Sequence, residues 1–101
     1  MYMKTLETLV YGEISKIPKG TVLTYKELAK RCGKPKAIRA VATIVGKNKN
    51  PIVIPCHRVV RSDFKVGEYT FNGKRNQKKK ISLLKSEGVL VKNGKVTTIR
   101  P

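Results

Sequence analysis

Apolar residues recur every three or four positions near the start of the chain, which predicts an amphipathic helix from Tyr2 to Lys16. The residues that would form its buried stripe are Met3, Leu6, Leu9, Val10, Ile14 and Ile17. Proline and glycine at positions 18 and 20 then end the helical pattern. A short β-prone run follows at residues 21–23, so the first helix leads into a strand.

Two short helices follow, joined by a turn that contains glycine. Thr24 and Glu27 have the form of a capping box, which predicts that a helix begins at Tyr25. Pro35 suits the first position of the next helix, which is expected to run from Lys36 to about residue 45. Two short helices around a glycine turn are typical of a helix-turn-helix, whose second helix normally enters a groove of DNA.

The second half of the chain combines short extended segments with one more helix. Residues 51–60 hold an apolar run between two prolines and are expected to be stiff and extended. Residues 61–73 are expected to form a loop able to fold over a ligand, and a helix is predicted for Lys74 to Ser86, with Lys78, Lys79 and Lys80 outside. An Asn-Gly pair at 93–94 predicts a tight hairpin within residues 89–99. The expected fold class is α/β, mainly α: a winged-helix-like helix-turn-helix domain with short strands and a C-terminal hairpin.

Composition and charge narrow the functional class. The chain has 101 residues, which suits one domain over residues 1–101, and 23 Lys and Arg against 6 Asp and Glu give a net charge of +17. A polyanion such as nucleic acid is the expected partner; a generally solvated basic surface is the alternative. No apolar run approaches the roughly 18 residues of a membrane span, and no export signal is evident, so an intracellular protein without membrane contact is expected. The two cysteines are expected to be free thiols rather than a disulfide, and with one histidine they are too few for a four-ligand structural zinc site.

The residues after the apolar run carry the candidate chemistry. Cys56 would react as a thiolate, and the adjacent His57 and Arg58 would lower its pKa electrostatically. Glu87 is placed at the end of a helix, where a carboxylate faces the negative end of the dipole, so it is expected to have a partner. If Glu87 holds one nitrogen of His57, the other nitrogen could take the thiol proton directly or through water. The alternative for Cys56 is a small buried apolar side chain, and this is the preferred interpretation for Cys32.

The run Pro55-Cys56-His57-Arg58-Val59 resembles the active-site signature of the O⁶-alkylguanine-DNA alkyltransferases. The resemblance extends from the helix-turn-helix to the helix end at residues 83–88 and covers the C-terminal DNA-binding and catalytic domain of that family. It implies that Cys56 accepts the alkyl group by in-line displacement at the alkyl carbon. Guanine would be restored and the protein consumed, without a cofactor or a metal.

The same resemblance assigns roles to individual residues. It makes His57 the water-mediated base, Glu87 the acid that orients it, and Asn48 a brace beneath the active site. Tyr25 would crowd a phosphate to drive nucleotide flipping and help to protonate the leaving base, while Arg39 would fill the gap in the base stack. The other DNA-binding residues would be Lys36, Ala40 and Ala42, and the alkylguanine pocket would comprise Val45, Cys56, Val59, Tyr69 and Thr70. Packing at the helix start is the alternative for Tyr25, and phosphate or solvent contact is the alternative for Arg39.

The chain also departs from the family pattern. We expect the N-terminal domain that usually precedes this one in the family to be absent. Ala42-Thr43 stand where many members have glycine or another very small residue, and residues 71–75 form a longer segment than in many relatives. We expect a monomer that binds double-stranded DNA carrying alkylated guanine. Two rival functions remain: a lesion sensor of the alkyltransferase-like class, in which the motif cysteine is commonly replaced by tryptophan, and a helix-turn-helix transcription regulator. The cysteine at position 56 argues against the sensor.

Overall fold

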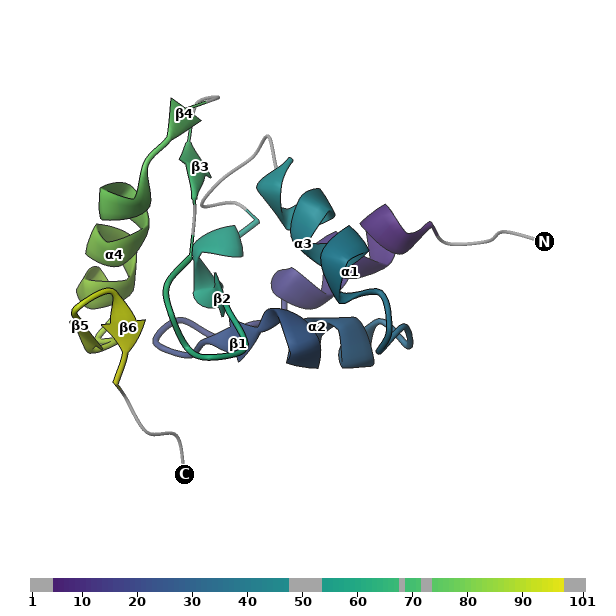
Figure 1. Cartoon of the computed structure of the whole chain (residues 1–101), viewed down its shortest axis with the longest axis horizontal. Helices are drawn as coiled ribbons and strands as arrows, with labels where there is room; N and C mark the ends of the chain where they lie inside the picture. The colour runs from purple at the N-terminus through teal and green to yellow at the C-terminus, as the bar shows by residue number, and fades with distance from the viewer. Residues whose placement is uncertain (1–4, 48–53, 68, 72–73, 98–101) are drawn as a thin grey trace.

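The computed structural model describes residues 5–47, 54–67, 69–71 and 74–97 (Figure 1). In chain order the elements are α1 (Leu6–Ile14), β1 (Leu23–Thr24), α2 (Tyr25–Arg31), α3 (Ile38–Gly46), η1 (Cys56–Arg58), β2 (Val59–Val60), β3 (Thr70–Phe71), β4 (Lys74–Arg75), α4 (Gln77–Ser86), β5 (Val91–Lys92) and β6 (Lys95–Val96). The expected fold class is confirmed: the domain is mainly helical, with short strands and a C-terminal hairpin.

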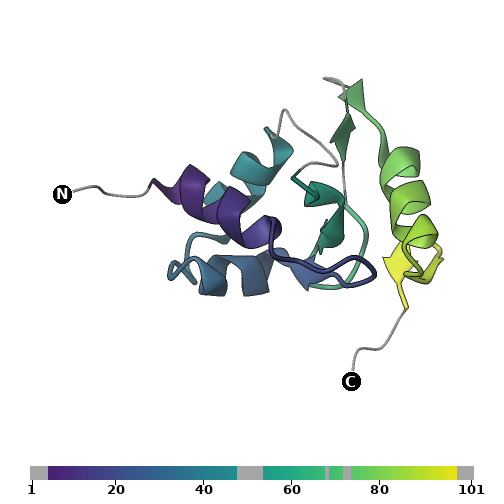
Figure 2. The same cartoon turned by 180° about the vertical axis from the view of Figure 1, so that it is seen from behind.

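Helices α1, α2 and α3 pack against one another and form one side of the molecule in both views (Figures 1 and 2). Helix α1 is shorter than predicted: the Thr5 side chain accepts from the Thr8 amide at its start, and residues 1–4 lie outside the described part of the chain. Its end also comes before Lys16, because the amides of Lys16 and Ile17 bond carbonyls only three residues back and leave the α-helical geometry. Ile17 still reaches the core and is 3% exposed.

The helix-turn-helix region starts as predicted. The Thr24 side chain accepts from the Glu27 amide at 3.1 Å and Glu27 accepts from the Thr24 amide at 3.0 Å, so the capping box is formed and α2 begins at Tyr25. Helix α3, however, begins at Ile38 rather than Lys36. The Ala37 amide bonds the carbonyl of residue 34 at 2.9 Å, so Pro35 occupies a turn before the helix and not its first position.

A two-residue parallel pairing joins the helical side to the rest of the molecule. Strands β1 and β2 pair with Leu23 opposite Val59 and Thr24 opposite Val60. Adjacent residues of a strand point to opposite faces, and the two valines accordingly belong to two different buried clusters. Val59 packs among the helices α1 to α3, and Val60 packs with Leu84 of α4 and the C-terminal hairpin. Because the pairing is parallel, the start of α2 lies beside the end of β2.

In the C-terminal part, the predicted start of the helix is wrong and the predicted hairpin is formed. Residues 74–75 were expected to be helical, but they pair with Thr70–Phe71 as a hairpin, and α4 starts only at Gln77, where the Asn76 side chain accepts from the amide of residue 79. The final hairpin is formed as predicted by β5 and β6, with Asn93 and Gly94 at φ 53° and 73°, the left-handed values that a tight hairpin turn requires.

Candidate active site

Cys56 begins a short 3₁₀ turn and not an extended segment. The amide of Arg58 bonds the Pro55 carbonyl at 3.0 Å, which closes the turn η1, and the chain becomes extended only at Val59. The prediction of a continuous extended stretch over 51–60 is therefore wrong at this turn, and residues 51–53 lie outside the described part of the chain. Pro55 has the restricted φ that was expected, −76°, but it stands directly before the turn. A proline in that position does not prevent the residues after it from forming a 3₁₀ turn. Cys56 is 4% exposed.

A pocket of about 510 Å³ opens beside this cysteine. Five of the residues expected to contact DNA or the lesion line it: Tyr25, Ala42, Val45, Cys56 and Tyr69. The sequence reasoning missed the other lining residues, which are Gly46, Arg61, Lys65, Gly67, Gln77 and Gly94. Arg61, Lys65 and Gly67 lie in the loop that was expected to fold over a ligand, so that expectation could have indicated them as pocket residues. The hairpin and the first turn of α4 gave no such signal, because their approach to the cysteine is a tertiary contact.

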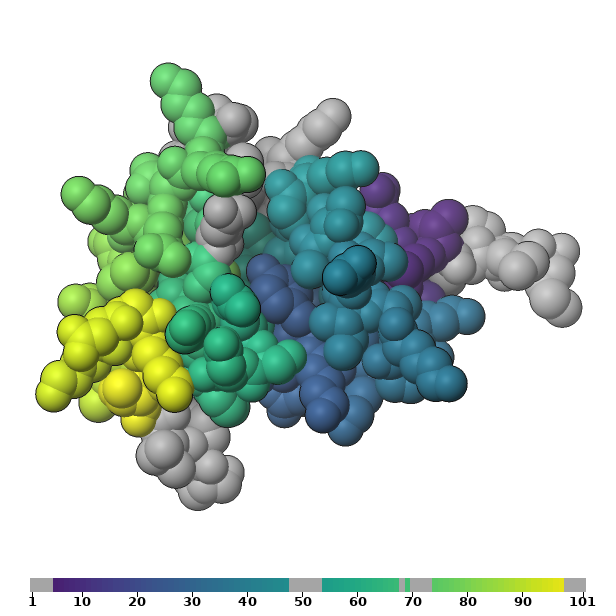
Figure 3. Space-filling model, viewed as in Figure 1, coloured from purple at the N-terminus to yellow at the C-terminus, as the bar shows by residue number. Residues whose placement is uncertain are grey.

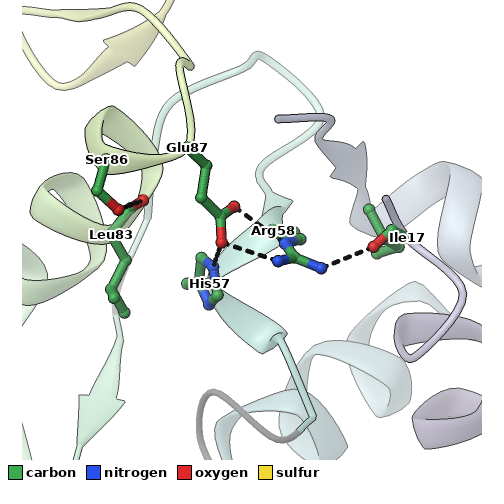
Figure 4. A network of polar contacts seen from close by, with 6 residues as sticks. All are labelled: Ile17, His57, Arg58, Leu83, Ser86 and Glu87. Atoms are coloured by element: carbon green, nitrogen blue, oxygen red, sulfur yellow. Dashed lines mark hydrogen bonds and ion pairs between the residues drawn. The ribbon is translucent and has the colours of Figure 1, made fainter. Parts of the chain in front are cut away.

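Glu87 lies at the centre of a polar network that joins the end of α4 to the turn η1 (Figure 4). Its Oε2 is 2.9 Å from His57 Nε2, and both of its carboxylate oxygens accept from the Arg58 guanidinium, at 3.0 Å from Nε and 2.8 Å from Nη2. The remaining Arg58 nitrogen, Nη1, donates to the Ile17 carbonyl at 2.8 Å. The Glu87 carboxylate thus ties the end of α4 to the cysteine turn, and Arg58 of that turn binds the loop after α1. The structure brings Glu87 and His57 together, as the sequence suggested. The hydrogen bonds of Arg58 to Glu87 and to the Ile17 carbonyl were not foreseen.

The network determines the charge states around the cysteine. Burial alone would raise the pKa of Glu87, but the hydrogen bonds from Arg58 and His57 lower it to about 2, so this carboxylate is an anion at neutral pH. Burial lowers the pKa of His57 and outweighs the opposing hydrogen bond and charge of Glu87. A neutral ring that donates from Nε2 to a carboxylate carries its lone pair on Nδ1. Within the described residues, His57 Nδ1 is buried and has no hydrogen-bond partner, so it is available as an acceptor.

Two aromatic hydroxyls also belong to this environment. The Tyr69 ring meets the His57 ring edge to face, with centroids 6.5 Å apart, and burial raises the pKa of Tyr69 to about 12, with the charge of Cys56 adding to the effect. The Tyr11 hydroxyl of α1 donates to the Ile44 carbonyl of α3 at 2.9 Å. Both tyrosines therefore remain protonated at neutral pH and act as walls or donors, not as bases.

The remaining predicted residues are distributed between a surface and the interior. Lys36, Arg39 and Ala40 are exposed around the start of α3 and do not line the pocket, while Val59 is fully buried in the core. On the face drawn in Figure 3, α2 and α3 lie side by side, and the segment 61–67 lies between them and the final hairpin. Thr70 pairs with residue 75 through its backbone. Asn48 lies outside the described residues.

Lys80 contradicts the prediction that residues 78–80 lie outside. Lys78 is exposed, but Lys80 is 1% exposed, because it lies one helical turn before Leu84 and shares that buried face of α4. Across the part of the chain that the structure describes, no three His, Cys, Asp or Glu side chains gather as metal ligands. Among those same residues, no helix is long and apolar enough to cross a membrane.

A helix-turn-helix pair beside a cysteine pocket defines a winged-helix-like domain with a thiol site. A family model described as "6-O-methylguanine DNA methyltransferase, DNA binding domain" matches residues 5–89. The chain belongs to this family.

Individual relatives agree with this assignment. The chain is 45% identical over 80 residues to the methylated-DNA–protein-cysteine methyltransferase of Methanothermobacter thermautotrophicus. The aligned region covers 79% of this chain and 42% of that protein. The solved structure of Mycobacterium tuberculosis OGT in complex with DNA is 31% identical, with a TM-score of 0.73 over 85% of this chain and 51% of that one. Schizosaccharomyces pombe Atl1 in complex with damaged DNA containing O6-carboxymethylguanine is 29% identical, with a TM-score of 0.74 over 89% and 82%.

The relatives differ from this chain in length. The chain spans 21% to 44% of the curated relatives compared, including the regulatory protein Ada of Salmonella typhimurium at the lower limit and the methyltransferase of Candida glabrata at the upper. It spans a larger share, 82%, of S. pombe Atl1. What those longer proteins do as a whole is therefore a matter of proposal for this chain.

Proposed function

We propose that this protein repairs DNA by moving an alkyl group from the O⁶ position of guanine to Cys56, once per molecule. The observation that carries the proposal is that Cys56 lines a pocket of about 510 Å³ and is followed in the chain by His57, which is hydrogen-bonded to Glu87. The volume lies within the range of about 300–1,000 Å³ that is usual for ligand sites. The match to a family of 6-O-methylguanine DNA methyltransferases supports guanine as the base that enters.

DNA would lie against the face that carries α2 and α3. The net charge of +17 favours a polyanion, and exposed Lys36 and Arg39 at the start of α3 supply cations at that face. An O⁶-alkyl group lies within the base stack of a duplex, so the nucleotide must be flipped out before the thiol can reach it. Tyr25 stands at the start of α2 and lines the pocket, a position from which it would meet the flipped nucleotide or its phosphate.

The chemical step is a displacement at carbon. The Cys56 proton passes through water to His57 Nδ1, and the sulfur attacks the alkyl carbon as the bond from that carbon to O⁶ breaks. A thioether forms on Cys56, and the electron pair of the broken bond stays on the guanine, which takes up one proton and is restored. Glu87 holds His57 by its Nε2–H throughout and so directs the basic nitrogen away from the carboxylate. The thioether leaves no nucleophile behind, which makes the reaction single-turnover.

The direct test is to incubate the protein with a duplex containing O⁶-methylguanine and to weigh its peptides by mass spectrometry. We expect one added methyl group on the peptide that holds Cys56, with a yield that saturates at one per protein molecule. Cys56→Ser and a duplex with unmodified guanine serve as controls, and neither should give the product. An unmodified Cys56 peptide after complete binding of the lesion duplex would refute the proposal.

A second candidate function is recognition of the lesion without repair. It is favoured by one observation, that the chain matches most of the length of S. pombe Atl1, whose solved structure contains damaged DNA. The same incubation separates the two functions. A lesion-binding protein would bind the O⁶-methylguanine duplex more tightly than the unmodified duplex and leave the methyl group on the DNA.

A further inference from the structure

The turn at residues 61–64 holds an aromatic residue in a backbone conformation that disfavours it. The Phe64 amide donates to the Arg61 carbonyl at 2.8 Å, and the Arg61 amide donates to the Lys65 carbonyl at 2.9 Å, which closes a tight loop. Phe64 is the last residue of this loop and has φ 68°. Glycine is the usual residue in that conformation, because a Cβ atom there crowds the following carbonyl oxygen.

The Phe64 ring is also left largely in water. Within the described residues, two large apolar side chains are exposed, Phe64 at 44% and Leu90 at 65%. Single exposed apolar residues are ordinary on a protein surface, but this one coincides with backbone strain. Strained residues of this kind are found mainly at functional sites. Burial thus compensates the strain of Phe64 only in part.

The 61–64 turn lies beside the helix-turn-helix. Its first three residues line a hollow of about 320 Å³ together with Tyr25 and Ile38, the first residues of α2 and α3. Arg61 also lines the cysteine pocket. The segment that contains the turn is exposed on the same face as α2 and α3 (Figure 3). Because the ends of a β-turn lie within about 7 Å of each other, Phe64 is close to the surface on which DNA would lie.

The backbone on both sides of the ring is fixed to the C-terminal hairpin. The Val96 amide donates to the Phe64 carbonyl at 2.9 Å, and the Val66 amide donates to the Gly94 carbonyl at 2.8 Å. These bonds hold the turn in place before any ligand arrives. A contact made by the ring would therefore cost little ordering of the chain.

The charges around the ring favour a polyanion. Arg61 and Lys65 are exposed in or next to the turn, and exposed Lys95 of β6 pairs with Lys65 through the backbone. Asp63 is the acid of the turn. Its carboxylate accepts from the Lys65 amide at 3.1 Å and lies 3.8 Å from Arg61 Nε, so it is engaged within the turn itself. An apolar ring among cations matches DNA, which offers phosphates next to the apolar faces of its sugars and bases.

We propose that Phe64 packs against the DNA strand that carries the alkylated guanine, at a nucleotide beside the one that enters the cysteine pocket. The ring lies on the apolar face of a base or sugar, and Arg61 and Lys65 meet the adjacent phosphates. The contact is next to the flipped nucleotide because Arg61, at the other end of the turn, lines the pocket that receives it. The choice of strand and nucleotide rests on the proposed function, whereas the contact with DNA can be measured whether or not an alkyl group moves.

Phe64→Gly separates binding from folding, because glycine removes the ring and the strain together. The affinity for a fluorescent O⁶-methylguanine duplex is measured by anisotropy, and stability is measured by urea unfolding. We expect the affinity to fall about tenfold, the effect of losing one stacked ring, while the urea midpoint stays the same or rises. Phe64→Tyr keeps a ring and should restore the affinity. Unchanged affinity in Phe64→Gly, or a lower urea midpoint, would overturn the proposal.

Leu90 provides the matched control. It lines a groove at the C-terminal hairpin that shares no residue with the cysteine pocket or with the hollow beside the turn. Leu90→Ser removes the other exposed apolar side chain and should leave the affinity for DNA unchanged. A loss equal to that of Phe64→Gly would show that the effect is not specific to the turn, and would overturn the proposal.

Fluorescence reports the contact directly. The chain has no tryptophan, so Phe64→Trp introduces a single indole at the turn. Saturation with the duplex is expected to quench its emission, because the indole stacks on DNA, whereas Leu90→Trp should keep its emission. Unquenched emission from Phe64→Trp at saturation would contradict the contact.

The outcomes distinguish this contact from repair and from self-association. If wild-type Cys56 takes up no methyl group while Phe64→Gly weakens binding and Phe64→Trp is quenched, repair fails and the contact stands. If methyl is taken up and neither Phe64 result holds, the contact fails and repair stands. Analytical ultracentrifugation completes the test: if Phe64→Gly changes only the association of the protein with its own copies, the ring serves that interface and the DNA proposal is overturned.

Discussion

Replacing Glu87 with glutamine tests the buried network at its centre. The substitution keeps the size of the side chain but removes the anion that accepts from His57 and twice from Arg58. Glutamine retains one carbonyl oxygen, and its amide nitrogen presents hydrogens to donors. The Arg58 side chain, 16% exposed, would keep the Ile17 carbonyl and at most one of its two hydrogen bonds to residue 87, and it would face no carboxylate charge. A buried charge that loses its partner is destabilising.

The magnitude follows from the pKa of the carboxyl group. Lowering that pKa from 4.5 to about 2 on folding corresponds to about 3 kcal/mol of stability at neutral pH. Because the folded-state pKa is the lower one, this contribution is fully present above pH 4.5 and is lost as the pH falls towards 2. We therefore expect Glu87→Gln to reduce the free energy of unfolding by about 3 kcal/mol at pH 7, within the range for breaking a buried ion pair. The difference should vanish near pH 2.

The assay is urea unfolding of both proteins, followed by circular dichroism at half-unit steps from pH 2 to 7. Glu13→Gln is the matched control, because Glu13 bonds Lys16 at 3.1 Å but that lysine side chain is 69% exposed. An exposed pair of this kind is worth less than about 1 kcal/mol, so the control should stay close to the wild type. Parallel stability profiles for the wild type and Glu87→Gln between pH 2 and 5 would refute the reasoning.

Two further predictions concern the proposed DNA-binding surface and the pocket loop. Arg39→Ala is expected to slow methyl transfer from a duplex much more than transfer from the free O⁶-alkylguanine base, because only the duplex requires the gap in the stack to be filled; equal slowing in both rate measurements would exclude that role. Gly67→Ala should cost about 1–2 kcal/mol in urea unfolding, because its φ is 77° and its Cβ would lie 3.2 Å from Arg61 Cγ. Gly12→Ala in α1, where a Cβ meets nothing within 4 Å, is the control and should be neutral or stabilising; an equal loss in both variants would contradict the backbone argument.

Features encoded by neighbouring residues could be predicted from the sequence. The capping box of Thr24 and Glu27 and the Asn93–Gly94 turn both form as expected, because each depends on residues at most three positions apart. The start of α4 could not be read in the same way. Basic residues with good helix propensity occupy positions 74–75, yet these residues form a strand because a partner at 70–71 pairs with them. Tertiary pairing outweighed local preference there.

In the candidate site, too, some residues could be predicted from their neighbours in sequence and others could not. Cys56 and His57 stand next to each other in a recognisable motif, and Glu87 was conspicuous as an acid at an unfavourable helix position. The burial of Lys80 left no such mark, because a lysine within a run of three normally faces solvent. Which of three consecutive residues turns inward depends on the register of α4, and that register is set by the packing of Leu84 among the valines of the second cluster.

The position of Glu87 late in the chain has a consequence for the order of synthesis. Its carboxylate contacts His57 across 30 intervening steps of sequence and Arg58 across 29. On the ribosome, the turn that holds Cys56 is therefore synthesised before the Glu87 carboxylate that it binds. The helix that carries Lys80 is also still missing at that stage. Domains of this size fold as units once the chain has emerged. Any special reactivity that these charges confer on the thiol thus appears only when the last helix docks, and a nascent chain or a fragment ending before α4 exposes an ordinary cysteine.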